Sequence, residues 1–328
     1  MSTQPVYSQN KEDKPLVSFI VTYYSEPVDM LKECISSILA LSLNETERQI
    51  IVVDDGADYS PINELLALSS NIVYVRQPNR GLGQARNTGI ELAEGSFIQF
   101  VDGDDLLLTS AYEQCLDIIR YRETDMVLFQ STDKKTSKPL ADAEGPISGT
   151  EYMTHNNLRG SVCTVLFRKD ILHDLRFPKG ILHEDEEFTP QLMLRAENLY
   201  FTNNKAYYYR KREGSIMHKR DKRWHIRRLS DAEQVLYRLK ERVDYLPVKE
   251  RIAMERRIAQ LTMDHIYNVI TMTHDETHLN HVLQRLSRHG LFPLPDKDYT
   301  SKYKWFRRMT NSSFGRKTLI MLLRINKG

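Results

Sequence analysis

The sequence predicts an α/β fold, a mainly parallel mixed sheet flanked by helices, with a helical extension at the C-terminus. Apolar runs without polar interruption are typical of strands covered on both faces. Where such runs alternate with segments of helical spacing, the strands run parallel and their crossovers are right-handed. Four such runs occupy the first hundred or so residues: 16–21, 50–53, 72–75 and 96–101.

Helices are expected between these strands. Apolar residues recur at helical spacing over 28–39, where Ser25 is the expected N-cap. A short helix is expected over 61–68, and a third ends near Ala93. The pattern is helical again over 223–288, which predicts a helical unit after the sheet.

The fourth strand ends in three carboxylates around one glycine, Asp102, Gly103, Asp104 and Asp105. A tight turn at the glycine brings the acids together, and their repulsion is tolerable only beside a cation or donor groups. Mg²⁺ and Mn²⁺ favour carboxylate oxygens and leave room for a diphosphate. A solvated Asp-Gly turn stays an alternative. An EF-hand is excluded, because leucines hold the positions that need an oxygen ligand and a glycine.

Polar residues also follow the first two strands, Thr22 and Tyr24 after one and Asp54 and Asp55 after the other. In an open α/β sheet, ligands bind at the carboxyl ends of the strands, so these ends together predict a site. A dinucleotide-binding dehydrogenase is excluded, because the turn after its first strand needs glycines and this turn has none.

Composition indicates an ordinary globular protein of 328 residues with a net charge of +2. Three cysteines far apart in apolar contexts indicate buried thiols in a reducing compartment. The polar residues 1–14 predict a loose tail, and no apolar run approaches the length of a membrane span. We therefore expect a cytoplasmic protein, soluble or peripheral at the inner face of the membrane.

Four motifs follow one another along the chain: 17–24, 52–56, 79–89 around Ala85-Arg86-Asn87, and Asp102-Gly103-Asp104-Asp105. In this order they resemble the motifs of the family 2 glycosyltransferases, which have the Rossmann-like glycosyltransferase-A fold. The resemblance covers roughly residues 16–130 and continues more thinly to about 218. Thr22-Tyr23-Tyr24 departs from the family's usual pattern at the base pocket.

The resemblance implies a nucleotide-sugar donor, most readily a UDP-sugar. Thr22, Tyr24 and Asp55 would line the nucleobase pocket, with the tyrosine stacked on a pyrimidine. Asp54 is implied in the same pocket, although a turn or cap role fits it equally well. For Tyr24, a core aromatic at a strand end is the alternative.

The resemblance also implies roles for the central carboxylates. Asp102 would face the ribose or the metal, and Asp104 would bind Mn²⁺ or Mg²⁺ directly. Asp105 would be structural or lie on the acceptor side. Arg86, on a helix that begins near the site, would reach the nucleotide or hold Asp102. The metal would stabilise the leaving diphosphate as a Lewis acid.

A general base is implied in the acidic cluster that opens a later helix. The resemblance assigns this role to Asp185 alone and places Glu184 near the acceptor. Carboxylates in a first helical turn are also favoured by the helix dipole without any function. One base and no second carboxylate as nucleophile imply a single displacement with inversion at the anomeric carbon.

Downstream, residues 206–210 alternate like an edge strand and lead into a basic loop. By the resemblance, Arg212 and His218 of this loop would bind the diphosphate or the metal, whereas a solvated basic loop is the alternative. The basic, aromatic and aliphatic residues of 299–325 suit an anionic membrane surface or a terminal helix docked on the protein. No nucleic-acid module is recognised.

The prediction is therefore an inverting, metal-dependent glycosyltransferase that extends a bacterial surface polysaccharide on a glycan or lipid-linked acceptor. A sugar nucleotidyltransferase would need a glycine-rich first turn, and a non-catalytic donor-binding scaffold would not need Asp185. A glycoside hydrolase is disfavoured, because its acid/base pair is spaced apart. The expected parts are a tail (1–14), a catalytic domain (15–220, with a nucleotide half 15–130 and an acceptor half 131–220) and a helical region (221–328).

Overall fold

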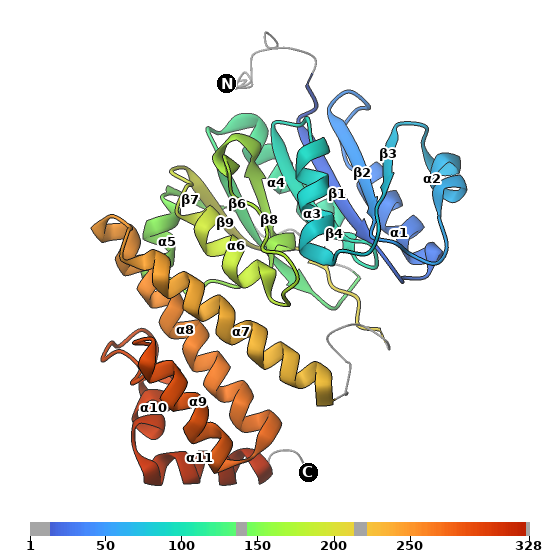
Figure 1. Ribbon diagram of the computed structural model, residues 1–328. Coiled ribbons are helices and arrows are strands. Elements are labelled where there is room, and N and C mark those ends of the chain that lie inside the picture. Colours follow the sequence, from blue (N-terminus) through green and yellow to red (C-terminus); the bar gives the residue numbers. More distant parts are fainter. Residues whose placement is uncertain (1–13, 136–142, 213–221, 326–328) are drawn as a thin grey trace. The chain divides into compact units, whose positions relative to one another are not determined.

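The computed structural model describes residues 14–135, 143–212 and 222–325. The chain forms two compact units. The first comprises residues up to 149 together with 160–215, and the second comprises 150–159 together with 216–328. Each unit has its own core, and Figure 1 shows the sheet of the first and the helices of the second.

The first unit is built on a nine-stranded mixed sheet in the order β3-β2-β1-β4-β8-β6-β9-β5, with β7 also paired to β9. This confirms the predicted α/β architecture. The strands are β1 (Val17–Tyr23), β2 (Arg48–Asp54), β3 (Ile72–Arg76), β4 (Phe97–Asp102), β5 (Leu106–Leu107), β6 (Met126–Thr132), β7 (Glu144–Ile147), β8 (Val165–Arg168) and β9 (Leu199–Tyr208).

The four predicted strands form the parallel half of the sheet, β3-β2-β1-β4 (Figure 1). All seven residues of β1 are buried, as a strand covered on both faces requires. The register pairs Thr22 with Val53 on one side and with Asp102 on the other. The carboxyl ends of β1, β2 and β4 therefore meet at one edge, where the sequence predicts the site.

The prediction of an edge strand over 206–210 is wrong. Residues 206–208 form the end of β9, and 209–210 follow it; β9 pairs with β6 on one side and with β5 and β7 on the other. Ala206 and Tyr207 are buried. Alternation reports which face of a strand is buried, but it does not report whether both edges find partners.

Helices α1 (Val28–Leu39), α2 (Ile62–Leu68) and α3 (Leu82–Leu92) confirm the three expected between the strands. Helix α1 begins after Pro27 without a side-chain cap, so the expected cap at Ser25 is wrong. Glu26 accepts hydrogen bonds from the two amides before it instead. The unit also holds α4 (Thr109–Tyr121) and α6 (Glu184–Met193).

Helix α3 packs closely on β1 and β2, and Gly89 makes this approach feasible. A Cβ atom at Gly89 would lie 2.2 Å from Cγ2 of Ile20, closer than atoms in contact can come. The three cysteines are buried and free, as predicted.

The second unit is helical, as the sequence predicts. Its helices are α7 (Lys222–Val243), α8 (Val248–Thr273), α9 (Glu276–Arg288), α10 (Ser301–Asn311) and α11 (Ser313–Ile325), joined by most of α5 (Gly149–His155). The long helix α8 packs with α7, α9, α10 and α11. Among the described residues, no helix is both long enough and apolar enough to cross a membrane.

Candidate active site

Arg86 on α3 is the centre of the candidate site. Its side chain is 2% exposed, and Nη2 donates to Oδ1 of Asp102 at 3.0 Å. Nη1 donates to Oε1 of Glu184 at 2.9 Å and also to Oδ1 of Asp185. One guanidinium therefore joins three of the predicted carboxylates, from the end of β4 and from the start of α6. Arg86 was expected either to reach the nucleotide or to bind Asp102, and the structure shows that it binds Asp102.

The start of α6 explains why Glu184 and Asp185 reach the site. His183 takes a left-handed backbone conformation before the helix, at φ 65°, and four acidic residues fill the first turn. The amide of Val162 donates to Oδ2 of Asp185 at 3.3 Å. Burial raises the pKa of Asp185 to about 7 against the lowering effect of Arg86, and the nearby acids add to the rise. At neutral pH this carboxyl can both hold and release a proton.

The turn after β4 is built around Gly103. Its amide donates to the carbonyl of Thr22 at 3.0 Å, and a Cβ atom there would lie 2.8 Å from that oxygen. The amide of Asp105 donates to the carbonyl of Asp102 at 2.9 Å and closes the turn. Glycine is needed at this position because the backbone of β1 leaves no room for a side chain.

Asp105 points into the protein. It is 1% exposed, and its oxygens accept from the hydroxyl of Tyr207 at 2.7 Å and from the amide of Arg210 at 2.8 Å. Burial raises its pKa to about 8, and the charge of Asp102 adds to this. Asp105 was expected either to be structural or to lie on the acceptor side. Its contacts join the turn after β4 to Tyr207 and Arg210, which corresponds to the structural role.

Asp104 is held by the basic segment after β9. Its Oδ2 lies 2.5 Å from Nε of Arg212, and its carbonyl accepts from Nε of Arg210 at 2.7 Å. Nη2 of Arg212 also lies 3.4 Å from Oε1 of Glu26. Arg212 therefore bridges the turn after β4 and the turn after β1. Burial raises the pKa of Asp104, and Arg212 partly offsets this.

Asp54 and Asp55 shape the loops around them. Asp54 is fully buried and accepts from the amide of Ala57 at 2.7 Å and the hydroxyl of Tyr74 at 2.6 Å. Asp55 accepts from Gln77 at 2.7 Å and from two amides of the loop before α3 at 2.8–2.9 Å. The sequence left open whether Asp54 lines the nucleobase pocket or is a turn residue. Its contacts are those of a turn residue.

Two predicted residues at the end of β1 have different exposures. Thr22 is 6% exposed, whereas Tyr24 is 44% exposed, as a stacking platform requires. The amide of Tyr24 donates to Glu26, the partner of Arg212, at 2.8 Å. His218 lies outside the described residues.

Some functional candidates were missed by the sequence argument. Tyr207 donates to Asp105 and accepts from the amide of Asp102 at 3.1 Å, while Glu26 holds Arg212. The signal for Tyr207 and Arg210 was present as a Tyr-Tyr-Tyr-Arg run, but its meaning depends on β9 reaching the turn after β4. Nothing local marks Glu26.

The site contains some of the ligands that a divalent cation needs. Among the described residues, no group of three His, Cys, Asp or Glu side chains is placed to hold a metal alone. Asp102 and Asp104 each have one oxygen bound by an arginine, and among the described residues neither acid has an ion pair with a second cation. Mg²⁺ and Mn²⁺ characteristically take one or two carboxylates and complete their shell with phosphate and water oxygens. The two acids therefore fit an ion that arrives with a diphosphate.

Comparison with known proteins identifies a family to which part of the chain is similar. Residues 18–172 match the model of "Glycosyl transferase family 2". Over these residues the chain is similar to the family 2 glycosyltransferases. The match includes the strand ends, Arg86 and the acidic turn, and it ends before Asp185.

Two relatives extend the match. The chain is 30% identical over 228 residues to the putative glycosyltransferase EpsH of Bacillus subtilis, covering 64% of this chain and 65% of EpsH. It is 26% identical over 217 residues to the poly(ribitol-phosphate) beta-N-acetylglucosaminyltransferase TarS of Staphylococcus aureus, covering 60% of this chain and 36% of TarS. The chain thus spans less than two thirds of these curated relatives.

Solved structures confirm the glycosyltransferase-A fold. S. aureus TarS 1–349 in complex with UDP-GlcNAc superimposes with a TM-score of 0.70 at 19% identity, covering 94% of this chain and 92% of that one. A mannosyltransferase from Pyrobaculum calidifontis in complex with GDP-Man and Mn²⁺ gives 0.58 at 13% identity, covering 94% and 85%.

Proposed function

We propose that this protein is an inverting family 2 glycosyltransferase that moves a sugar from a nucleotide-diphospho-sugar to an acceptor hydroxyl. The observation that carries the proposal is the hold of Arg86 on Asp102, Glu184 and Asp185. It places a carboxyl with a pKa near 7 beside the acidic turn where the resemblance puts the donor diphosphate. A base and a leaving-group site are the two parts that a single displacement needs.

In the proposed reaction, Asp185 takes the proton of the acceptor hydroxyl as that oxygen attacks the anomeric carbon. The new carbon–oxygen bond forms while the bond to the diphosphate breaks, and the departing electrons stay on the diphosphate. Arg86 and the amide of Val162 keep the carboxylate oriented during the transfer. Glu184 shares Arg86 and lies on the acceptor side.

The donor would lie along the strand ends. Tyr24 offers its exposed ring to the base, and Thr22 and Asp55 form the floor of that pocket. A Mn²⁺ or Mg²⁺ ion held by Asp104 and Asp102 would supply Lewis-acid stabilisation of the leaving diphosphate. Arg212 would contact the diphosphate from the other side. UDP is favoured as the nucleotide because TarS, which shares the fold, binds UDP-GlcNAc.

The acceptor would be a glycan or lipid-linked saccharide of a bacterial surface polymer. Support comes from TarS, whose name gives poly(ribitol-phosphate) as the acceptor. A peripheral contact of 299–325 with the inner face of the cytoplasmic membrane is part of the proposal. It is supported by α11, where Phe314 is 83% exposed and Met321 is 59% exposed on the same helix as Lys317. Apolar and basic side chains on one helix suit an anionic bilayer surface. Residues 15–220 would then be the catalytic domain and 221–328 its helical partner.

Calorimetry tests the donor site. UDP, GDP and TDP would be titrated into the protein with and without Mn²⁺, and into the Asp104→Ala and Asp58→Ala variants. Asp58 is an exposed acid after β2 and serves as the charge-matched control. We expect UDP to bind with Mn²⁺, and this binding to weaken at least ten-fold in Asp104→Ala alone. A folded protein that binds no nucleotide would overturn the proposal.

A further inference from the structure

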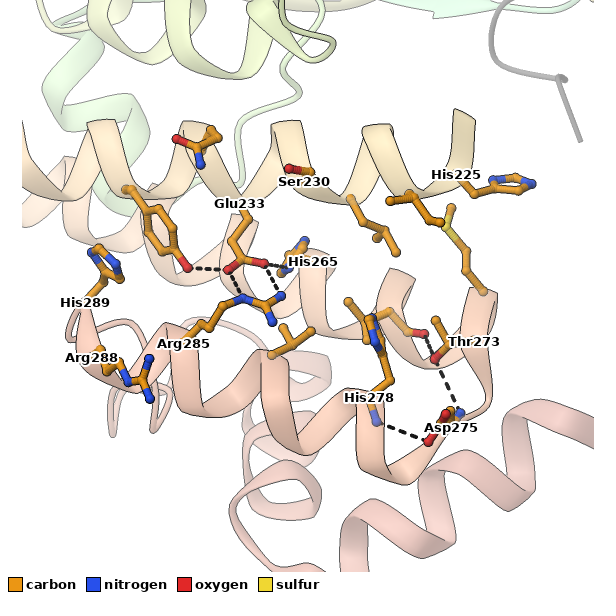
Figure 2. A pocket seen from close by; sticks show the side chains of 17 residues that line it. His225, Ser230, Glu233, His265, Thr273, Asp275, His278, Arg285, Arg288 and His289 are labelled. Carbon is orange, nitrogen blue, oxygen red and sulfur yellow. Dashed lines mark hydrogen bonds and ion pairs between the residues drawn. The ribbon is translucent and has the colours of Figure 1, made fainter. Parts of the chain in front are cut away.

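The helical unit contains a groove that the proposed transfer does not use. It has a volume of about 870 Å³ and is lined by residues of α7, α8 and α9 and of the turn before α9 (Figure 2). Ligand sites in proteins usually have volumes of a few hundred to about a thousand Å³. Helix α8 packs with both α7 and α9 and forms the floor between them.

The groove contains a buried acid that is already neutralised. Glu233 of α7 accepts from Nε of Arg285 at 2.7 Å and from Nη2 of Arg285 at 2.9 Å, and the hydroxyl of Tyr237 donates to it as well. Figure 2 shows Glu233, Arg285 and His265 close together in the groove. The only buried carboxylate among the lining residues is therefore matched by one guanidinium.

Two further basic side chains, Arg288 and His289, lie at the C-terminal end of α9 and line the groove. Arg288 is exposed one helical turn from Arg285, and no ion pair is found for it in the described structure. The ring of His289 stacks on Tyr237 with centroids 3.7 Å apart. His265 is 3% exposed, and its Nε2 lies 3.6 Å from Oε2 of Glu233, so this imidazole belongs to the Glu233 cluster. Arg288 and His289 therefore form the basic end of the groove.

Apolar side chains line the rest of the groove. Leu229 of α7, Val269 of α8 and Val282 of α9 lie between the basic end and the turn at Asp275. Asp275 is used as the N-cap of α9, because its side chain accepts from the amides of Thr277 and His278. A molecule seated here would thus meet guanidinium and imidazole donors at one end and apolar walls along its length.

We propose that this groove binds a phosphate-bearing molecule with an apolar body, its phosphate at Arg288 and His289. A phosphate offers three oxygens, and guanidinium groups bind such oxygens strongly. A carboxylate ligand offers only two oxygens, and the groove already contains a carboxylate of its own, Glu233, bound to Arg285. The ligand is either a soluble phosphate ester or the phosphate of a lipid headgroup.

The test uses the full chain and three soluble probes, phenyl phosphate, inorganic phosphate and phenylacetate, in calorimetric titrations. Phenyl phosphate should bind more tightly than inorganic phosphate, because it also fills the apolar part, and phenylacetate should bind weakest. Arg288→Gln should weaken phosphate binding about ten-fold, as expected for a lost charged hydrogen bond. Arg251→Gln, on α8 but outside the groove, is the matched control.

A second arm separates the sources of the phosphate. Flotation with vesicles of phosphatidylcholine and phosphatidic acid, compared with phosphatidylcholine alone, reports lipid capture. Arg288-dependent binding to phenyl phosphate identifies a soluble ester, and Arg288-dependent capture only by phosphatidic acid identifies a lipid headgroup. The proposal is overturned if neither probe binds, if phenylacetate binds as well as phenyl phosphate, or if Arg251→Gln weakens binding as much as Arg288→Gln. Nucleotide binding at the strand ends should be unchanged in both variants.

Discussion

Asp185 and Glu233 are both largely buried carboxylates bound to an arginine, and they differ in how many acids share that arginine. Arg86 serves Asp102, Glu184 and Asp185 together, whereas Arg285 pairs with Glu233 alone. The pKa of Asp185 is accordingly raised to about 7, while the pKa of Glu233 is held well below its usual range by Arg285, His265 and Tyr237 against the effect of burial. Burial raises the pKa of both carboxyls. The ratio of acids to cations around each one then decides whether it can take up a proton at neutral pH.

The largest effect is expected when Asp185 loses its ability to accept a proton. Asp185→Asn keeps the shape of the side chain and should lower the transfer rate by about 10²–10⁴-fold, the range of a general base. Donor binding by calorimetry should stay within about two-fold of the parent protein. A variant that still transfers sugar at the parent rate would remove Asp185 from the mechanism, and Glu186→Gln in the same helical turn is the control.

The next largest effect is expected on the stability of the protein, when Arg86, the arginine shared by the three acids, is replaced. Arg86→Gln leaves three acids close together without their arginine, and breaking a buried ion pair in this way costs about 3–5 kcal/mol. Thermal unfolding followed by circular dichroism checks this. Arg80→Gln, at an exposed position just before α3, should leave the melting temperature unchanged. Equal melting curves for the two variants would mean that Arg86 does not hold the acids together.

A smaller loss is expected at Glu233, because half-exposed Arg285 can turn to water when its partner is removed. Glu233→Gln should destabilise the protein by about 1–3 kcal/mol at pH 7. Since the folded-state pKa of Glu233 is lowered, its contribution is present above the ordinary value near 4.5 and is lost as the pH falls below it.

The parent protein should therefore lose more stability between pH 6 and pH 3 than Glu233→Gln does. Melting temperatures over this range provide the measurement. Glu241→Gln, an exposed acid on the same helix, should behave like the parent. A parent and a Glu233→Gln variant with parallel pH curves would contradict the lowered pKa.

The smallest effect is the pH dependence of transfer. The proposed base, Asp185, can accept a proton only when it is deprotonated, so the rate should fall about ten-fold for each pH unit below its pKa of about 7 and level off above it. The measurement is kcat at saturating donor and acceptor between pH 5.5 and 8.5. A rate that is flat across pH 7 would show that the acids sharing Arg86 do not set the proton affinity of the base.

Much of the first unit was predictable because its signals are local. Apolar runs report strands buried on both faces, and the polar residues after them had to meet at one edge once the strands were parallel. The position of β9 was not predictable, because alternation does not say which strands pair on its two sides. Tyr207 and Arg210 were consequently missed as supports of the acidic turn.

The sequence by itself determined the α/β alternation, the acidic turn at Asp102–Asp105 and the helical C-terminal region, since each depends on residues close together in the chain. Only the tertiary structure decided that Arg86 would hold acids nearly a hundred residues away, that Arg212 would bridge Asp104 and Glu26, and that the helices would enclose a basic groove. These features depend on charges brought together from distant segments, and the ratio in which cations and acids meet is fixed by packing and not by local pattern.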